Sequence, residues 1–338
     1  MRCYKDGLTL LSDPALVSVA PGLYALRFEL LKAACAHRAV TELLRAGTIH
    51  PGATVIDSSS GLYALALGLA CRRENVQCYI VGSTSIDPCI AAQLRLLGVA
   101  LETMPPTDSL SQDQNRRVAR IHDLLAEHPG WHWMQQYHSV VHALGYEKIG
   151  SDLAETLGSS HSSLSLVCPV GTGASSAGLY SGLSCGDLEI TMVAVEPFGS
   201  VSFGSEHIAD PAMLIAGIGS SIAFGNIRHD IFDAVHWVSS EVAASGCSNL
   251  LQHTGLFVGL SSGAAYVAAE YEHAAGSPRA DHATVFLCPD TGHRYVESIM
   301  GHNCVSSSPH VALPRPHLLD RASARPKIAL PWSRCSLR

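Results

Sequence analysis

Strand-length apolar runs alternate with helix-length segments over most of this chain. The apolar runs lie at residues 53–57, 76–81, 99–104, 131–134, 163–170, 188–197 and 283–290. The helical patterns lie at residues 62–73, 88–98, 111–128 and 145–158. Such alternation is typical of parallel sheets whose two faces are covered by helices. The sequence therefore predicts an α/β fold with parallel sheets and helices on both faces.

Composition limits the classes of partner that this chain can take. Its 338 residues suffice for about two domains, and 47% apolar with 15% charged residues indicates a large core. The net charge of −7 gives no general attraction to nucleic acid or to an anionic membrane. We find neither a secretory signal nor an apolar run of about 18 residues. We therefore predict a cytoplasmic protein with no nucleic-acid or membrane partner.

Cysteine and histidine are frequent but scattered. The eleven cysteines form no C-x-x-C pair, and most stand inside apolar runs, which favours buried, reduced thiols. The eighteen histidines include no H-E-x-x-H pattern, and the proximity of His302 and Cys304 does not make a zinc site. We therefore predict no metal site.

A glycine-rich turn follows the apolar run at residues 163–170. The stretch "VCPVGTGASSAGLYSGL" (167–183) reads as a strand, a tight loop and a helix start. Backbone N–H groups at the N-terminus of a helix favour a phosphate, and small residues let the chain turn closely around it. No G-K-[ST] follows, so this is not a Walker loop, and loops of this kind also occur for packing alone. The residues concerned are Gly171, Thr172, Gly173, Ala174 and Ser175.

Two further small-residue loops carry competing interpretations. In "VIDSSSGLYALAL", Ser59, Ser60 and Gly61 are suited to hold a carboxylate, or they form an N-cap cluster. Residues 259–263 match the G-x-S-x-G pattern of α/β-hydrolases around Ser261. Asp290 and His293 follow in the hydrolase order, but they stand three residues apart, which is poor geometry for a triad.

Lysine is rare in this chain. It occurs only at positions 5, 32, 148 and 327. Lys32 lies in "LRFELLKAACAHRAV", among apolar and small residues. An apolar environment favours the neutral, nucleophilic amine that a Schiff-base lysine requires. The alternative is a helix lysine that extends its charge to solvent.

The order of these segments resembles the cysteine-synthase-like branch of fold-type II pyridoxal phosphate (PLP) enzymes over about residues 12–300. "DSSSG" is similar to its substrate loop, "QQY" to its glutamine segment and "GTGAS" to its phosphate loop. The other matching segments are "VAVEPFGSVSFG", "IAGIGSS", "GLFVGLSSGAA" and "FLCPDTGHRY". The resemblance implies a tryptophan synthase β-like architecture of two α/β domains with PLP between them, in a homodimer.

The resemblance also implies a domain organisation. Residues 1–36 and 144–305 correspond to the larger, PLP-binding domain, and residues 37–143 to a smaller inserted domain. Residues 306–338 are rich in Pro, Ser and Arg, and we expect a mobile tail there, with a docked extension as the alternative.

Site residues follow from the resemblance by position. Lys32 corresponds to the Schiff-base lysine and catalytic base. Gly171, Thr172, Gly173, Ala174 and Ser175 correspond to the phosphate loop, and Ser261 to the partner of the pyridine nitrogen. The substrate-binding positions are Ser59, Ser60, Gly61, Gln136 and Gly217. The family's Asn-Pro-x-Gly-Ser stretch before the lysine is missing here, and Leu62 replaces its cofactor-contacting asparagine.

The implied reaction is β-replacement on an activated L-serine through an α-aminoacrylate. The segments "DSSSG", "QQY" and "EPFGSVSFG" look most like siderophore-pathway synthases. Those enzymes join O-phospho-L-serine to L-glutamate, forming N-(2-amino-2-carboxyethyl)-L-glutamate on the route to 2,3-diaminopropionate. Three alternatives remain: O-acetyl-L-serine as substrate, cysteine synthesis from sulfide, and a non-catalytic relative that binds a partner.

Overall fold

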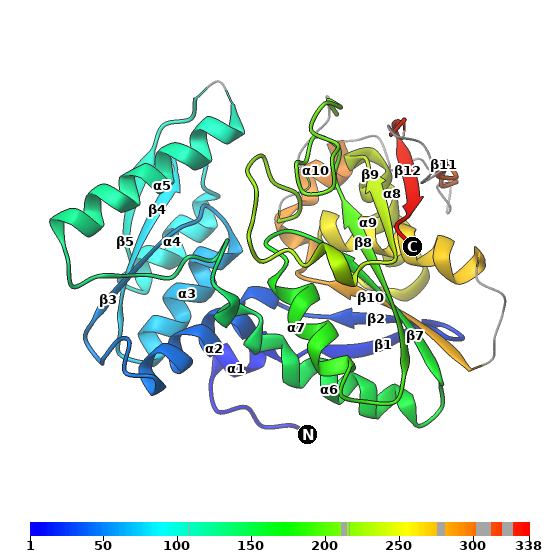
Figure 1. Cartoon of the computed structure of the whole chain (residues 1–338), viewed down its shortest axis with the longest axis horizontal. Helices are drawn as coiled ribbons and strands as arrows, with labels where there is room; N and C mark the ends of the chain where they lie inside the picture. The colour runs from blue at the N-terminus through cyan, green and yellow to red at the C-terminus, as the bar shows by residue number, and fades with distance from the viewer. Residues whose placement is uncertain (108, 211–214, 216, 276–280, 302–311, 320–326) are drawn as a thin grey trace. The chain divides into compact units, whose positions relative to one another are not determined.

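The computed structural model describes residues 1–107, 109–210, 215, 217–275, 281–301, 312–319 and 327–338 (Figure 1). The chain divides into two compact units. The first comprises residues 1–13, 30–145 and 224–226, and the second comprises the described residues of 14–29, 146–223 and 227–338. Residues 1–13 and 30–36 thus differ from their predicted place in the larger domain, because they form helices that pack within the first unit.

A parallel sheet forms the centre of the first unit. Its strands follow the order β5-β4-β3-β6, and every pair is parallel. The strands are β3 (Thr54–Ser58), β4 (Gln77–Ser83), β5 (Ala100–Met104) and β6 (His132–Trp133). Strand β3 lies inside the sheet, so the loop that follows it opens at the carboxyl edge, where ligands bind in α/β folds.

Helices cover both faces of this first sheet. Helix α5 (Leu110–Glu127) packs on one face, where Ile121 and Leu124 contact Ile56 and Val81. Helix α3 (Leu62–Arg73) packs against β4, α4 (Pro88–Leu96) and α2 (Leu31–Arg45). The short helices of the unit are α1 (Gly7–Ser12) and the 3₁₀ turn η1 (Val140–His142). Asp87 and Ser109 cap α4 and α5 with their side-chain oxygens, as the N-cap rule predicts.

A larger sheet forms the centre of the second unit. In the described part of the chain its order is β1-β2-β10-β7-β8-β9-β12-β11. The strands are β1 (Ala15–Ala20), β2 (Leu23–Arg27), β7 (Ser163–Pro169), β8 (Glu189–Glu196), β9 (Ala234–Val238), β10 (His282–Cys288), β11 (His317–Leu319) and β12 (Trp332–Ser336). The pairs β1–β2 and β12–β9 are antiparallel, and the others are parallel.

Helices lie on both faces of this second sheet as well. Figure 1 shows α6 (Leu144–Gly158) and α7 (Ala174–Leu183) on one face, with α8 (Ser240–Thr254) and α9 (Leu260–Ala275) on the other. The remaining helical segments are η2 (His229–Ile231), η3 (Gly292–Arg294) and α10 (Val296–Gly301). The predicted α/β fold with parallel, helix-covered sheets is therefore confirmed. None of the helices within the described ranges is long and apolar enough to cross a bilayer.

The C-terminal segment differs from the predicted mobile tail. Residues 306–311 and 320–326 lie outside the described residues, but β12 extends the second sheet beyond β9. The indole Nε1 of Trp332 donates a hydrogen bond to Nδ1 of His236 on β9, at 3.0 Å. The guanidinium of Arg334 forms an ion pair with Glu272 on α9. The docked alternative therefore describes residues 332–336, whose short alternating pattern is hard to recognise within a Pro- and Arg-rich sequence.

Candidate active site

The serine-rich loop lies between β3 and α3 in the first unit. The hydroxyl oxygen of Ser60 accepts a hydrogen bond from the backbone N–H of Ser83, at 2.6 Å, which ties the loop to β4. Gly61 is the N-cap residue of α3, and no side chain caps the first turn. This argues against the interpretation of the serines as a capping cluster and in favour of a loop that presents uncapped N–H groups.

Gln136 lies beside this loop. Its side-chain amide donates to the carbonyl oxygen of Ser58, at 2.6 Å, and its backbone N–H donates to Asp57 Oδ2, at 3.0 Å. The structure therefore brings Gln136 to the loop that contains Ser59, Ser60 and Gly61, although about 75 residues separate them in the sequence. Four of the five predicted substrate-binding residues thus lie together in the first unit.

Asp57 is a buried carboxylate beneath the loop. Its oxygens accept hydrogen bonds from the backbone N–H groups of Ser58 and Gln136 and from Nε1 of Trp133, at 2.8 to 3.1 Å. Burial raises the pKa of this carboxyl to about 6, and the hydrogen bonds oppose that rise. The side chain fixes the end of β3 and the start of the loop, so its position bears directly on the candidate site.

Two side chains at this loop were missed in the sequence. Nε of Arg117, on α5, donates to the hydroxyl oxygen of Ser58, at 3.1 Å. The phenol of Tyr137 donates to the carbonyl oxygen of Ser58, at 3.4 Å, and stacks on Phe224 with ring centroids 4.4 Å apart. Arg117 looked like any arginine of an amphipathic helix. Only the packing of α5 on the sheet places its positive charge beside the serine loop.

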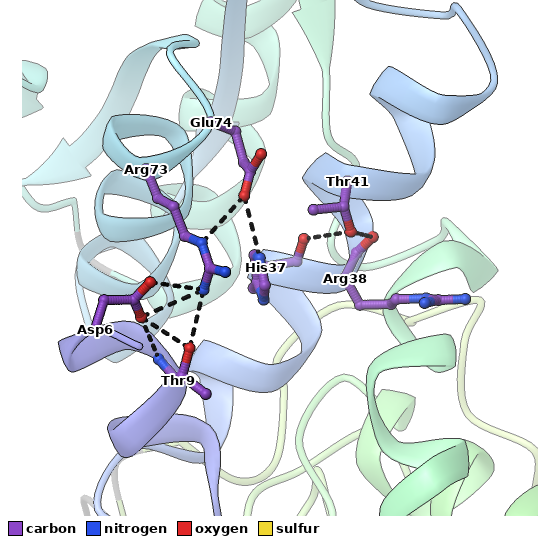
Figure 2. Close-up of polar contacts among 7 residues, drawn as sticks. All are labelled: Asp6, Thr9, His37, Arg38, Thr41, Arg73 and Glu74. Atoms are coloured by element: carbon purple, nitrogen blue, oxygen red, sulfur yellow. Dashed lines mark hydrogen bonds and ion pairs between the residues drawn. The ribbon is translucent and has the colours of Figure 1, made fainter. Parts of the chain in front are cut away.

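Lys32 lies on the first turn of α2, where its side chain is partly exposed. Figure 2 shows the polar contacts that fix α2 to its neighbours in the same unit. Arg73, in the last turn of α3, forms ion pairs with Asp6 and Glu74. Glu74 also contacts Nε2 of His37 on α2, at 3.3 Å. This network holds α1, α2 and α3 together and fixes the helix that carries Lys32.

The glycine-rich loop joins β7 to α7 in the second unit. Gly173 is the N-cap residue of α7 with φ 84°, a left-handed conformation that favours glycine, and no side chain caps the helix. A Cβ atom on Gly171 would clash with the carbonyl oxygen of Gly217, so only glycine fits there. The structure thus brings Gly217 to the predicted phosphate loop. Thr172, Ala174 and Ser175 complete the loop.

The residues of this loop fit the phosphate of PLP. The first turn of α7 presents backbone N–H groups without a side-chain cap, and the adjoining residues are small enough for a close approach. Ser261 is buried in the first turn of α9. Among the hydrogen bonds of the described residues, none links Ser261 to Asp290 or His293. The structure therefore gives no support to a serine hydrolase.

The predicted site residues divide between the two units. Lys32 and the serine loop belong to the first unit, and the phosphate loop belongs to the second. The first unit contains Lys32, Ser59, Ser60, Gly61 and Gln136. The second contains Gly171, Thr172, Gly173, Ala174, Ser175, Gly217 and Ser261.

Comparison with known proteins identifies the family. Residues 31–290 match the family model described as "Pyridoxal-phosphate dependent enzyme". The N-(2-amino-2-carboxyethyl)-L-glutamate synthases of Ralstonia nicotianae and Cupriavidus metallidurans are 33% and 30% identical to this chain, over 76% of it and 74% of each relative. The chain therefore belongs to the pyridoxal-phosphate-dependent enzyme family, which confirms the predicted family and cofactor.

A solved structure shows the same fold. The cysteine synthase of Entamoeba histolytica superposes with a TM-score of 0.76 at 19% identity, over 87% of this chain and 90% of that one. At this level of identity the likeness shows the fold alone. It confirms the predicted fold-type II architecture.

Proposed function

We propose that this enzyme catalyses β-replacement on an activated L-serine with L-glutamate as the nucleophile. The similar synthases are named for N-(2-amino-2-carboxyethyl)-L-glutamate. That product is a glutamate whose nitrogen carries the three-carbon skeleton of serine without its hydroxyl group. One C–N bond forms at the serine β-carbon, the β-substituent departs as phosphate or acetate, and the glutamate amine loses a proton.

PLP, when bound, supplies an electron sink for the negative charge that develops at the substrate α-carbon. In our proposal the uncapped N–H groups at Gly171–Ser175 hold its phosphate, and Ser261 faces its ring nitrogen. Nζ of Lys32 holds the cofactor, removes the substrate α-proton and later returns a proton to the product. Ser59, Ser60, Gly61 and Gln136 bind the substrate α-carboxylate, and Gly217 lines the site.

The position of Arg117 is the observation that favours an anionic substrate. Its guanidinium hydrogen-bonds the hydroxyl of Ser58, next to the proposed carboxylate loop. A guanidinium pairs well with carboxylate or phosphate oxygens. Either the phosphate of O-phospho-L-serine or the second carboxylate of glutamate suits this charge, whereas the alternative nucleophile sulfide has no such group.

The first test is the visible absorption of purified protein mixed with PLP. We expect a band from lysine-bound cofactor, and we expect Lys32→Ala to abolish both the band and turnover. Lys148→Ala is the matched control, because Lys148 is an exposed lysine that forms its ion pair with Asp152 on its own helix. Product mass and phosphate or acetate release with glutamate, and separately with sulfide, identify the two substrates.

Each outcome of this test decides between alternatives. A band at saturating PLP that disappears with Lys32→Ala supports the enzyme. If no band forms, the non-catalytic alternative replaces it. A bound cofactor with turnover on sulfide but none on glutamate would instead make the protein a cysteine synthase. We expect Arg117→Ala to raise KM for the anionic substrate about tenfold or more, since a charged hydrogen bond is lost.

We also infer that the enzyme is a cytoplasmic homodimer in siderophore or 2,3-diaminopropionate biosynthesis. The homodimer and the pathway follow the sequence resemblance described above. Light scattering during size-exclusion chromatography measures the mass in solution. A monomer mass of 35.8 kDa at working concentrations would contradict the dimer.

A further inference from the structure

The turn at residues 135–139 carries Gln136, one of the residues proposed to bind the substrate carboxylate. Gln135, at the start of this turn, has φ 51°, a left-handed conformation that is unfavourable for most residues with a side chain. The backbone N–H groups of His138 and Ser139 both donate to the carbonyl oxygen of Gln135, at 2.9 and 2.8 Å. Because the start of the turn is not one that its residues favour by themselves, contacts from elsewhere in the first unit are needed to hold it.

Residues 224–226 supply such contacts. They belong to the first unit, although the residues on either side of them belong to the second. The ring of Phe224 stacks on Tyr137, with centroids 4.4 Å apart, and the backbone N–H of Gly225 donates to Nδ1 of His138, at 3.3 Å. A Cβ atom on Gly225 would lie 2.8 Å from that nitrogen. Two consecutive residues thus pack directly on the turn.

Asn226 adds three hydrogen bonds to the same turn. Its side-chain Nδ2 donates to the carbonyl oxygens of Gln136 and Ser139, at 3.0 and 3.2 Å. Its backbone N–H donates to the carbonyl oxygen of Tyr137, at 3.2 Å. The residue is 7% exposed, and its Oδ1 has no hydrogen-bond partner among the described residues. Both hydrogens of the side-chain amide are therefore used to fix the turn.

Gln136 is held on both sides of its backbone as a result. Asp57 accepts from its N–H, and Asn226 donates to its carbonyl oxygen. Its side-chain Nε2 donates one hydrogen to the carbonyl oxygen of Ser58, at 2.6 Å. A primary amide has two N–H hydrogens, so Nε2 has a second one to donate to a ligand. The direction of that second hydrogen depends on the backbone of Gln136, and hence on Asn226.

We propose that Asn226 is a positioning residue for the substrate α-carboxylate. It acts through Gln136, by holding the backbone carbonyl of that residue so that the second hydrogen of Nε2 is directed at the carboxylate. The inference rests on the proposed function, in which Gln136 binds this group. It adds to the candidate site a residue that lies 90 positions further along the chain.

The test compares two ligands that differ only in the carboxylate group. L-Serine carries this group, ethanolamine lacks it, and neither has a good leaving group. Calorimetric titration of the PLP-loaded protein gives a dissociation constant for each. We expect the wild type to bind L-serine more tightly than ethanolamine. We expect Asn226→Ala to weaken L-serine about tenfold and to leave ethanolamine within about twofold, since the hydrogen bond to a charged group is lost.

Two further variants check the chemical basis of this effect. Asn226→Asp keeps the shape of the side chain but places an oxygen against two carbonyl oxygens, so we expect at least the same loss of L-serine affinity. Asn75→Asp is the matched control, because it makes the same change at an exposed position of the same unit. The preference of Asn75→Asp for L-serine should equal that of the wild type.

A double variant separates positioning from loss of structure. In Gln136→Ala the amide that Asn226 positions is absent, so we expect Asn226→Ala to leave the ratio of the two dissociation constants unchanged in that background. If Asn226→Ala lowers the melting temperature but keeps the wild-type ratio, its role is structural and the proposal is wrong. An equal change of the ratio with and without the Gln136 amide would also overturn it. Failure of the proposed function looks different, since the wild type itself would then bind L-serine no more tightly than ethanolamine, and this inference would fail with it.

Discussion

The pKa values of two carboxylates, the buried Asp57 in the first unit and the partly buried Glu272 in the second, are shifted in opposite directions. Asp57 in the first unit is surrounded by neutral donors, and burial raises its pKa to about 6. Glu272 in the second unit contacts the guanidinium of Arg334 and Nε2 of His236, and its pKa falls to about 2. Burial alone would raise both values. At Glu272 the hydrogen bonds from His236 and from the Arg334 guanidinium outweigh burial, whereas the neutral donors around Asp57 do not.

The opposite pKa shifts of Asp57 and Glu272 match the different positions of the two carboxylates in the structure. Glu272 joins α9 to β9 and to the C-terminal strand β12, and its charge is paired with Arg334. These contacts hold the edge of the second sheet in place. Asp57 lies under the serine loop proposed to bind a substrate carboxylate. A strongly paired cation there would compete for that substrate. Neutral donors fix the loop and leave Arg117 available for an anion.

Glu272→Gln tests the paired carboxylate and has the largest expected effect on stability. Removing the charge leaves the Arg334 guanidinium partly buried without its anion, and the side chains of Glu272 and Arg334 are only 15% and 21% exposed. We expect the free energy of unfolding at pH 7 to fall by about 3–4 kcal/mol, as for a broken buried ion pair. Urea unfolding followed by circular dichroism measures it.

The control for that loss is Glu155→Gln, the same change on an exposed position of α6. We expect a change within about 0.5 kcal/mol there. The pH dependence gives a second check. Because the folded pKa of Glu272 lies below its ordinary value of 4.5, its contribution is complete above about pH 5.5 and disappears towards pH 2. A loss that stays constant down to pH 2 would contradict the ion-pair explanation.

Asp57→Asn tests Asp57, the carboxylate that has no cationic partner among its hydrogen-bond donors. The pH dependence expected for its contribution to stability is opposite in sign to that of Glu272. The folded pKa of Asp57 lies above its ordinary value, so the folded state binds more protons between about pH 4 and 6. The stability of the wild type relative to the variant should therefore fall by about 2–3 kcal/mol as pH rises through that window.

Urea unfolding of both proteins at pH 4, 5, 6 and 7 measures this difference. Asparagine does not titrate, so any slope in the difference belongs to Asp57. A flat difference across the window would mean that the three donors fully offset burial. A difference that favours the wild type as pH rises would mean that Asp57 has a cationic partner in solution, and the comparison with Glu272 would fail.

Much of the fold was predictable because its signals are local. The predicted helix at residues 62–73 coincides with α3, and the predicted run at 53–57 differs from β3 by one residue at each end. Strands β1, β2, β9, β11 and β12 were missed. Strand β9 is a short apolar run without a flanking turn signal, and β12 combines Trp332 and Cys335 with polar residues whose partners lie about 60 to 100 residues earlier.

The candidate site was predictable where residue type alone restricts it. At Gly171 the backbone of another segment comes too close for a Cβ atom, and Gly173 has a positive φ. Glycine suits both situations, so its presence in the sequence pointed to these positions. Arg117 carries no such local signal. Its role depends on a contact with Ser58, which lies 59 positions away, and only the folded structure brings the two residues together.

Arg334→Lys has the smallest expected effect on stability, because it keeps the positive charge and replaces only the planar guanidinium with an ammonium group. The guanidinium of Arg334 contacts both oxygens of Glu272, with Nη2 to Oε2 at 3.2 Å, whereas an ammonium is a point charge that cannot bridge them in the same plane. We expect a loss of about 1 kcal/mol in urea unfolding at pH 7, smaller than for Glu272→Gln, since Glu272 keeps a cation nearby. An equal loss from both variants would show that bidentate geometry, rather than charge, stabilises β12. That outcome would remove the electrostatic basis for contrasting Glu272 with Asp57.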